Sequence, residues 1–258
     1  QDHADTSPSP SEEVLKSGRV FLLTGGLGRI GLSLAGSLLA FSPECTVVLT
    51  TRGTFPPQSE WASILSSSEG KEAKRVKPVE NLWREFGERV VVRGGVTMES
   101  RESMLDLLED VLEKNGEITG ILHLAGLADL KYIPEASESI LRAEMGPKVS
   151  MVTHLSWALE QLLHPGPQFV VLFSSMAAVL GGYGMVAYTA ANSFMDSFVA
   201  QKEESGSGCM WVSVNWDDWA FQYGKEQTAA YELTGTAKFA IQPKEGFQAL
   251  VLALASAA

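Results

Sequence analysis

The sequence predicts an α/β fold, a doubly wound parallel sheet with helices on both faces. Short apolar segments alternate with longer, helix-like ones along most of the 258 residues, which is typical of a parallel sheet buried between two layers of helices. A glycine-rich turn follows the first apolar segment and opens a helix, so the sheet is expected to be of the Rossmann type. With 45% hydrophobic residues, the chain can bury one sizeable core.

The expected strands are short and largely apolar. Arg19–Thr24 is the first of them, and Phe169–Phe173 is a nearly continuous apolar run, as in a strand that is buried on both faces. Four other segments have the same character. In chain order, the expected strands are Arg19–Thr24, Thr46–Thr50, Arg89–Arg93, Gly120–Leu124, Phe169–Phe173 and Trp211–Asn215.

The expected helices lie between these strands. Glu99–Lys114 is periodic, with charged residues on one face, which favours an amphipathic helix. Ser137–Leu163 is longer, and Pro147 within it predicts an interruption. In chain order, the expected helices are Ile30–Ala40, Glu99–Lys114, Ser137–Leu163, Val186–Lys202 and Lys244–Ala253.

Three segments fall outside this alternation. Residues 1–17 are rich in Ser, Pro, Asp and Glu and are expected to form a linker or disordered tail, which leaves one domain over residues 18–258. Residues 54–87 are longer than a simple crossover needs, so we interpret them as an insertion with one or two helices over the sheet edge. Residues 217–240 are expected to form a lid over the substrate.

Composition and charge exclude several classes of protein. The formal net charge is −11 and the pI is about 4.9, and a surface this acidic repels nucleic acid. No apolar run approaches the roughly 18 residues that a membrane helix needs, and no signal peptide opens the chain. Cys45 and Cys209 adjoin apolar segments, so we interpret them as buried small residues and not as a disulfide or a metal site. We expect a cytoplasmic protein without a metal.

A glycine-rich turn follows the first expected strand. Residues 24–31 read Thr-Gly-Gly-Leu-Gly-Arg-Ile-Gly, with G-x-G-x-x-G across Gly26, Gly28 and Gly31. Glycines let the backbone approach a pyrophosphate, and the N-terminus of the next helix stabilises its charge. The turn predicts a dinucleotide site; a simple glycine-rich turn is the alternative.

The end of the second strand indicates which dinucleotide is bound. A site that prefers NAD carries an acidic residue there for the ribose 2′-hydroxyl. This chain has Thr51 and Arg52 instead, and a guanidinium matches a 2′-phosphate in charge and geometry. The pattern favours NADPH; a solvent-facing arginine at a strand end is the alternative.

A Ser, Tyr and Asn cluster spans the end of the fifth strand and the start of the next helix. Ser175 precedes Tyr188 by thirteen positions, and Asn192 follows Tyr188 by four, on the same helix face. Both segments meet the carboxyl edge of the sheet, where ligands bind. A tyrosine hydroxyl with a pKa of about 10 is a poor acid at neutral pH unless a nearby cation lowers that pKa. Lys148 is the candidate cation.

On these residues the chain resembles the short-chain dehydrogenase/reductase superfamily, and within it the catalytic half of ketoreductase domains from modular polyketide and mixed polyketide–peptide synthases. Ordinary members of the superfamily carry Tyr-x-x-x-Lys. This chain has Asn192 at the lysine position and a lysine at Lys148, an exchange that typifies the synthase ketoreductases. The similarity covers residues 18–254 and includes residues 24–31, His123–Gly126 and Val214–Trp216.

The resemblance implies an NADPH-dependent ketoreductase that reduces the 3-keto group of a ketoacyl thioester on an acyl carrier protein. Tyr188 would donate the proton and Ser175 would bind the carbonyl oxygen. Lys148 would lower the pKa of Tyr188 and bind the nicotinamide ribose, while Asn192 would order Lys148 or a water. The implied cofactor contacts are Thr24, Gly25, Gly26, Leu27, Gly28, Ile30, Gly31, Thr51, Arg52, Gly95, Val96, Ala125, Gly126, Lys148 and Tyr188, and the implied substrate contacts are Leu180, Gly182, Tyr183 and Met185.

The chain departs from the family pattern at two places. The third strand usually ends in Asp-Val, which reaches the adenine, and here it ends in Gly95-Val96, so one cofactor contact is lost. Two sequence signatures of the family indicate the stereochemistry of the product, and both are absent. Ala128-Asp129-Leu130 replaces the Leu-Asp-Asp signature of one class, and Leu180 replaces the tryptophan of the other.

The resemblance also implies partners. These are an acyl carrier protein with its phosphopantetheine-tethered substrate, a second, catalytically silent Rossmann-like half, and neighbouring synthase domains. Carrier domains are typically acidic, so docking to this acidic chain would use a local basic patch, with Arg142 and Lys131 as candidates, or tethering within one polypeptide. Two alternatives stay open: a free-standing reductase of small ketones, and a catalytically silent domain.

Overall fold

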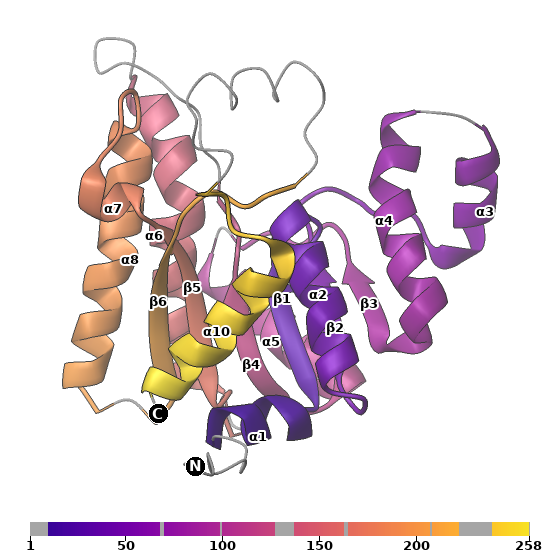
Figure 1. Ribbon diagram of the computed structural model, residues 1–258, viewed down its shortest axis with the longest axis horizontal. Coiled ribbons are helices and arrows are strands. Elements are labelled where there is room, and N and C mark those ends of the chain that lie inside the picture. Colours follow the sequence, from indigo (N-terminus) through magenta and orange to yellow (C-terminus); the bar gives the residue numbers. More distant parts are fainter. Residues whose placement is uncertain are drawn as a thin grey trace, which may run out of the picture.

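Six parallel strands form one sheet in the order β3-β2-β1-β4-β5-β6 (Figure 1). The computed structural model describes residues 10–67, 70–98, 100–126, 137–162, 165–206, 208–221 and 239–257. From β1 in the middle, the chain winds first to β3 at one edge, returns to β4 beside β1, and then winds to β6. The strands are β1 Val20–Thr24, β2 Thr46–Thr50, β3 Val90–Arg93, β4 Ile118–His123, β5 Phe169–Ser175 and β6 Met210–Trp216.

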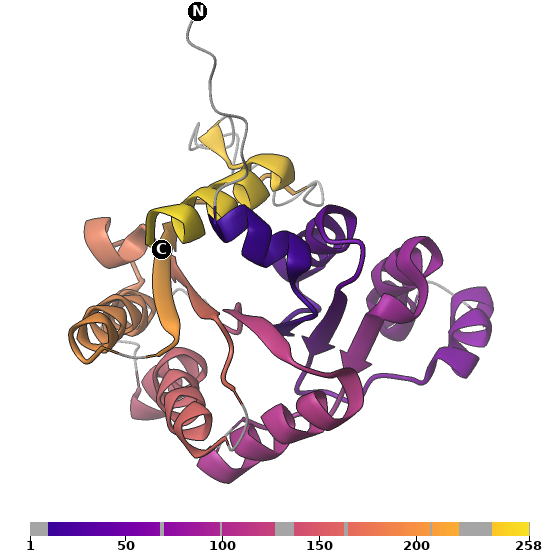
Figure 2. The same ribbon diagram turned by 90° about the horizontal axis from the view of Figure 1, so that it is seen from below.

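Helices cover both faces of this sheet (Figure 2). One face carries α1 Pro10–Ser17, α2 Arg29–Phe41 and α10 Pro243–Ala257. The opposite face carries α5 Arg101–Asn115, α6 Glu138–Gln161 and α8 Val186–Glu204. Among the described residues, the other helical segments are α3 Gln58–Ser67, α4 Lys71–Phe86, the 3₁₀ turn Gly87–Arg89 and the single turn α7 Ala177–Leu180.

The two helical layers produce two apolar cores separated by the sheet. Phe21 of β1 packs in one core with residues of α2 and α10, whereas Leu22 packs in the other with residues of α5 and α6. Successive side chains of a strand point to opposite faces, so each strand must be apolar at nearly every position. This confirms the predicted Rossmann-type α/β fold with helices on both faces.

Helix α6 runs through Pro147 without the predicted interruption. Proline removes one backbone hydrogen bond from a helix, but α6 buries Met151, Val152 and Leu155 against the sheet. Tertiary packing of an apolar face contributes most of the stability of a helix in a protein. The prediction of an interruption was wrong because this packing outweighs the lost bond.

The predicted linker over residues 1–17 is also wrong in its second half. Pro10–Ser17 forms helix α1, and Leu15 is fully buried in the same core as Leu254 of α10. The apolar contact that orders α1 therefore comes from the other end of the chain, which local composition does not reveal. Residues 1–9 lie outside the described residues.

The segment interpreted as an insertion, residues 54–87, holds the two helices α3 and α4 beside the β3 edge (Figures 1 and 2). Trp61 anchors α3: its indole nitrogen donates to the Pro56 carbonyl at 2.9 Å, and its ring packs edge-on against Phe55. Of the expected lid, residues 222–238 lie outside the described residues, and Trp219 pairs with Ile241 in a single parallel bridge.

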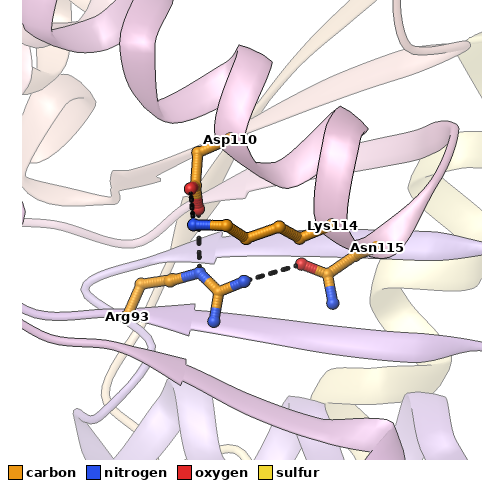
Figure 3. Close-up of polar contacts among 4 residues, drawn as sticks. All are labelled: Arg93, Asp110, Lys114 and Asn115. Atoms are coloured by element: carbon orange, nitrogen blue, oxygen red, sulfur yellow. Dashed lines mark hydrogen bonds and ion pairs between the residues drawn. The ribbon is translucent and has the colours of Figure 1, made fainter.

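The edge strand β3 is fastened to α5 by a polar cluster (Figure 3). Arg93 Nε donates to Asp110 at 3.0 Å, and Arg93 Nη2 donates to Asn115 Oδ1 at 3.1 Å. Lys114 also pairs with Asp110, and its hydrogen bond, followed by that of Arg93, holds the pKa of the Asp110 carboxyl below its ordinary value. The cluster fixes the strand end that leads into Gly95 and Val96.

Across the described ranges, no helix is long and apolar enough to span a bilayer. In the same part of the chain, no group of three or more His, Cys, Asp or Glu side chains could hold a metal ion. Neither Cys45 nor Cys209 forms a disulfide among the described residues, and burial raises the pKa of Cys209 to about 12.

Candidate active site

A cavity of about 620 Å³ opens at the carboxyl edge of the sheet. It lies between the turn after β1, the end of β4, the end of β5 and the start of α8. Nine of the predicted site residues line it together: Gly25, Gly28, Ile30, Gly126, Lys148, Ser175, Leu180, Met185 and Tyr188. Residues from five parts of the sequence thus converge on one site.

The turn after β1 is shaped for close backbone packing. Gly25 has φ +70°, and a Cβ there would lie 2.9 Å from Ala125 Cα. A Cβ on Gly31 would lie 2.5 Å from the Gly26 carbonyl oxygen. Gly28 caps α2 without a side-chain hydrogen bond, so the first N–H groups of the helix stay open to the cavity. An anion such as a pyrophosphate fits this helix N-terminus.

Lys148 of α6 lines the cavity, although only 4% of its surface is exposed. Its Nζ donates to the Phe173 carbonyl at 2.8 Å and lies 5.6 Å from the centroid of the Tyr188 ring. Burial lowers the pKa of Lys148 to about 8, although the Asp196 carboxylate opposes this shift. Lys148 can therefore change its charge near neutral pH.

Tyr188 and Asn192 lie on successive turns of α8. Asn192 is fully buried, and its Nδ2 donates to the Tyr188 carbonyl at 2.7 Å. Its Oδ1 accepts no hydrogen bond from the described residues, so this acceptor is available beside the Tyr188 turn. Asn192 does not line the cavity but lies directly beneath residues that do.

Ser175 ends β5 and is half-buried. Its Oγ accepts a hydrogen bond from the Ala177 N–H at 3.1 Å, which leaves the hydroxyl hydrogen for another acceptor. Asn215 on β6 braces the same residue, because its Nδ2 donates both to the Ser175 carbonyl at 3.1 Å and to Asp196 Oδ2 at 2.8 Å. The serine is thereby held from both sides of the β5 end.

His123, which was not predicted as a site residue, bridges two parts of the site. It is almost fully buried, and its Nε2 donates to the Pro147 carbonyl at 2.8 Å, so its Nδ1 accepts from the Thr24 hydroxyl at 2.7 Å. Burial, followed by the Lys148 charge, lowers the pKa of His123 to about 4. The neutral ring thus connects the glycine turn to the residue before Lys148.

The other predicted cofactor residues lie away from the cavity. Thr24 is buried, and Gly26, Leu27, Gly31 and Ala125 build the turn and its contact with β4. Thr51 and Val96 are joined at the ends of β2 and β3 by the hydrogen bond from Val96 N to Thr51 O at 3.1 Å, and Gly95 N donates to Gly53 O at 3.0 Å. Arg52 is exposed beside them.

The predicted substrate residues divide into two groups. Leu180 and Met185 line the cavity, whereas Gly182 and Tyr183 do not, and Tyr183 is 86% exposed on its rim. A further wall of the cavity lies at the end of β6 and in the segment after it, which was predicted to form a lid over the substrate but without any residue named as a contact. This wall consists of Trp216, Asp217, Asp218, Trp219 and Phe221.

One signal could have found that wall, since the residues after each parallel strand reach the ligand-binding edge. The segment had been assigned only to a lid.

Of the other residues singled out in the sequence, residues 128–130 and Lys131 lie outside the described residues. Arg142, the other candidate for a basic patch, pairs with Glu138 at 2.7 Å on the exposed face of α6.

Comparison with known proteins identifies the family. The family profile described as KR domain matches residues 19–221, most of the chain. The chain belongs to the KR domain family. Ketoreductase domains with this fold are oxidoreductases that bind a nicotinamide cofactor, and the open helix N-terminus of α2 fits the cofactor's pyrophosphate.

Curated relatives of this KR domain are polyketide synthases. The low-reducing polyketide synthase drtA of Aspergillus calidoustus is 35% identical over 202 residues, 77% of this chain and 8% of the synthase. Polyketide synthase PksL of Bacillus subtilis is 28% identical over 254 residues, 96% of this chain and 5% of the synthase. The chain therefore spans less than a tenth of the length of either relative.

The chain is also similar to solved structures of ketoreductase domains. A ketoreductase domain from the bacillaene assembly line has a TM-score of 0.74 and 27% identity, covering 93% of this chain and 54% of that one. An A1-type ketoreductase has a TM-score of 0.74 and 25% identity, covering 99% of this chain and 49% of that one. The KR domain described here thus corresponds to about half of each of these two chains.

Proposed function

We propose that this KR domain uses NADPH to reduce the 3-keto group of a ketoacyl thioester, carried on an acyl carrier protein, to the 3-hydroxyacyl thioester. The observation that carries the proposal is the position of Lys148. Its buried ammonium lies 5.6 Å from the Tyr188 ring in a cavity that Ser175 also lines. A cation, a phenol and a hydroxyl meet where a ketone could bind.

Each residue has a definable task in this chemistry. NADPH, when bound, supplies the hydride. Tyr188 donates its hydroxyl proton to the ketone oxygen, and the Lys148 charge beside the ring favours the phenolate that remains. Ser175 can direct its hydroxyl hydrogen toward the same oxygen, because the bond from Ala177 N–H engages only a lone pair of its Oγ. Fixed donors of this kind stabilise developing negative charge by roughly 3–4 kcal/mol each.

Asn192 serves the return of the proton to Tyr188. Its Oδ1 is buried without a described partner one helical turn from Tyr188, where it can accept from Lys148 or from a water. Lys148, with a pKa near 8, can then release and recover a proton during turnover. This proton path uses only groups that lie beside or below the cavity.

The choice of NADPH is supported by the end of β2. Arg52 is exposed there, and no acidic side chain takes its place for a ribose 2′-hydroxyl. A guanidinium favours a 2′-phosphate in charge and in geometry. Thr51, Gly95 and Val96 form the adjoining backbone.

The carrier protein and the neighbouring domains belong to the same proposal. Relatives named polyketide synthases are many times longer than this chain, and the matched ketoreductase structures are about twice as long. We propose that a second, structural half and a carrier protein accompany the domain in a cytoplasmic synthase. Tethering within one polypeptide would bring the carrier to this acidic domain without charge attraction.

The test follows NADPH oxidation with a 3-ketoacyl-N-acetylcysteamine thioester, comparing the unmodified chain with Tyr188→Phe and Ser175→Ala. We expect turnover with NADPH, weaker turnover with NADH, and losses of at least about a hundredfold in both variants. Ser197→Ala is the matched control, since Ser197 lies on the exposed side of α8. Equal rates in Tyr188→Phe and the unmodified chain would refute the assignment.

A further inference from the structure

The helical insertion reaches the adenosine end of the expected cofactor site. Because β3 runs parallel to β2, helix α4, which leads into β3, must begin at the carboxyl edge of the sheet and run back along it (Figure 1). The first two turns of α4 therefore lie on the same side of the molecule as the end of β2. They carry Lys71, Lys74, Arg75 and Lys77.

Arg75 makes this proximity specific. Its Nη2 donates to the Thr54 carbonyl at 3.0 Å, and its guanidinium lies 5.7 Å from the centroid of the Phe55 ring. A Cβ on Gly53 would lie 3.5 Å from the same Nη2. The guanidinium is thus held against the two residues that directly follow Arg52.

The contacts of Arg75 leave donors for a ligand. A guanidinium carries five N–H donors, and the bond to Thr54 engages one of them. Arg75 is half-buried, so it is braced against the loop but still reached by solvent. A braced guanidinium loses little conformational freedom when it binds an oxyanion, which favours bidentate binding.

The distribution of charge also favours a phosphate site near Arg75. The chain as a whole carries −11, which opposes the approach of a doubly charged phosphate. Residues 70–77 carry four cationic side chains and one acid, Glu72. The segment thus has a local excess of positive charge, although Lys77 pairs with Glu80 at 3.9 Å, and its Arg75 contacts the loop after β2. A single exposed ion pair between Arg52 and the phosphate would contribute little in water.

We propose that Arg75 is a second binding residue for the 2′-phosphate of NADPH, so that the insertion helix α4 takes part in selecting NADPH over NADH. Arg52 and Arg75 bind the phosphate from the strand end and from the helix. The inference rests on the proposed use of NADPH by this domain. It adds a residue from outside the glycine turn and the β2 end to the cofactor site.

The experiment separates binding of the 2′-phosphate from catalysis. Isothermal titration measures adenosine 2′,5′-bisphosphate and adenosine 5′-monophosphate binding to the unmodified chain, Arg75→Gln and Arg75→Lys. We expect Arg75→Gln to weaken the bisphosphate roughly 10- to 100-fold, as for a lost charge-assisted hydrogen bond, and to change 5′-monophosphate binding less than about twofold. Arg75→Lys keeps the charge without the fork and should fall between the two.

Arg84→Gln is the matched control. It makes the same change in net charge on the same helix, and Arg84 pairs with Glu80 nine residues from Arg75. Nine helical residues span about 14 Å, beyond the Debye length of about 8 Å at physiological salt. The control should leave binding of both nucleotides unchanged.

Each contrary outcome has one meaning. If Arg75→Gln and Arg84→Gln bind the bisphosphate equally well, Arg75 does not contact the phosphate. If Arg75→Gln weakens both nucleotides to the same extent, Arg75 only supports the loop at Thr54, and the proposal is overturned. If the unmodified chain itself does not prefer the bisphosphate, the assignment of NADPH fails, and the role of Arg75 fails with it.

Discussion

Replacing Gly126 by alanine tests whether the position of the Lys148 ammonium controls reduction. A Cβ at residue 126 would lie 2.8 Å from Lys148 Cε and 3.3 Å from Nζ, so the end of the lysine side chain must shift, and we expect this to weaken its 2.8 Å bond to the Phe173 carbonyl. A hydrogen bond from a charged group contributes roughly 1.5–3 kcal/mol. If the displaced ammonium stabilises the transition state less by a similar free energy, reduction slows roughly 10- to 150-fold.

The assay compares initial rates of NADPH oxidation, at saturating NADPH and a 3-ketoacyl thioester, with the thermal midpoint of each variant. Gly146→Ala is the matched control, because Gly146 lies on α6 two residues before Lys148 and a Cβ there meets no atom within 4 Å. Alanine should raise helix stability at that position by up to about 1 kcal/mol. If Gly126→Ala turns over as fast as Gly146→Ala, the position of Lys148 does not limit the reaction.

Three further predictions concern charge and backbone shape. Because the Lys148 pKa is about 8, the ammonium is present below that pH and lost above it, so kcat/KM should fall as pH rises past about 8; a flat profile would contradict its role. Burial lowers the pKa of His123 from 6.5 to about 4, so the folded state binds this proton less well than the unfolded state, and about 3 kcal/mol of stability should be lost as pH falls from 6.5 to 4. Urea unfolding of the unmodified chain and of His123→Gln at the two pH values measures this loss. If the free energy of unfolding changes equally with pH in both proteins, His123 is not the cause. Gly25→Ala places a Cβ 2.9 Å from Ala125 Cα at φ +70° and should abolish NADPH binding in a fluorescence titration, whereas Gly28→Ala, whose closest approach is 3.4 Å, should weaken it less.

The strands were predictable from the sequence because a parallel sheet between two layers of helices buries both faces of each strand. A strand such as β5 is buried on both faces, and every residue of Phe169–Ser174 is buried, so its apolar run stands out without any alignment of sequences. Helix α1 gave no such signal. Its described buried residue is Leu15, and α1 packs mainly against α10 at the far end of the chain, a contact that the local sequence does not record.

The site also has residues that the sequence predicts and residues that it does not. Spacing was enough to predict that Ser175, Tyr188 and Asn192 lie together at the carboxyl edge of the sheet, where Ser175 and Tyr188 line the cavity. The groups that position them were not found. The Phe173 carbonyl that holds Lys148 is a backbone atom, which any residue would supply. Asp196 and Asn215 meet across two elements, and such a pairing leaves no fixed spacing in a single sequence.

Lys148 and Tyr188 lie on different helices, α6 and α8, although both contribute to one site. A Tyr-x-x-x-Lys pair would be formed by any folded α8, since residues four apart share a helix face. Here the pair exists only while α6 and α8 are docked against the sheet. The proposed reduction would therefore require the tertiary packing of these helices, and activity should disappear in a state that keeps its helices but has lost their packing.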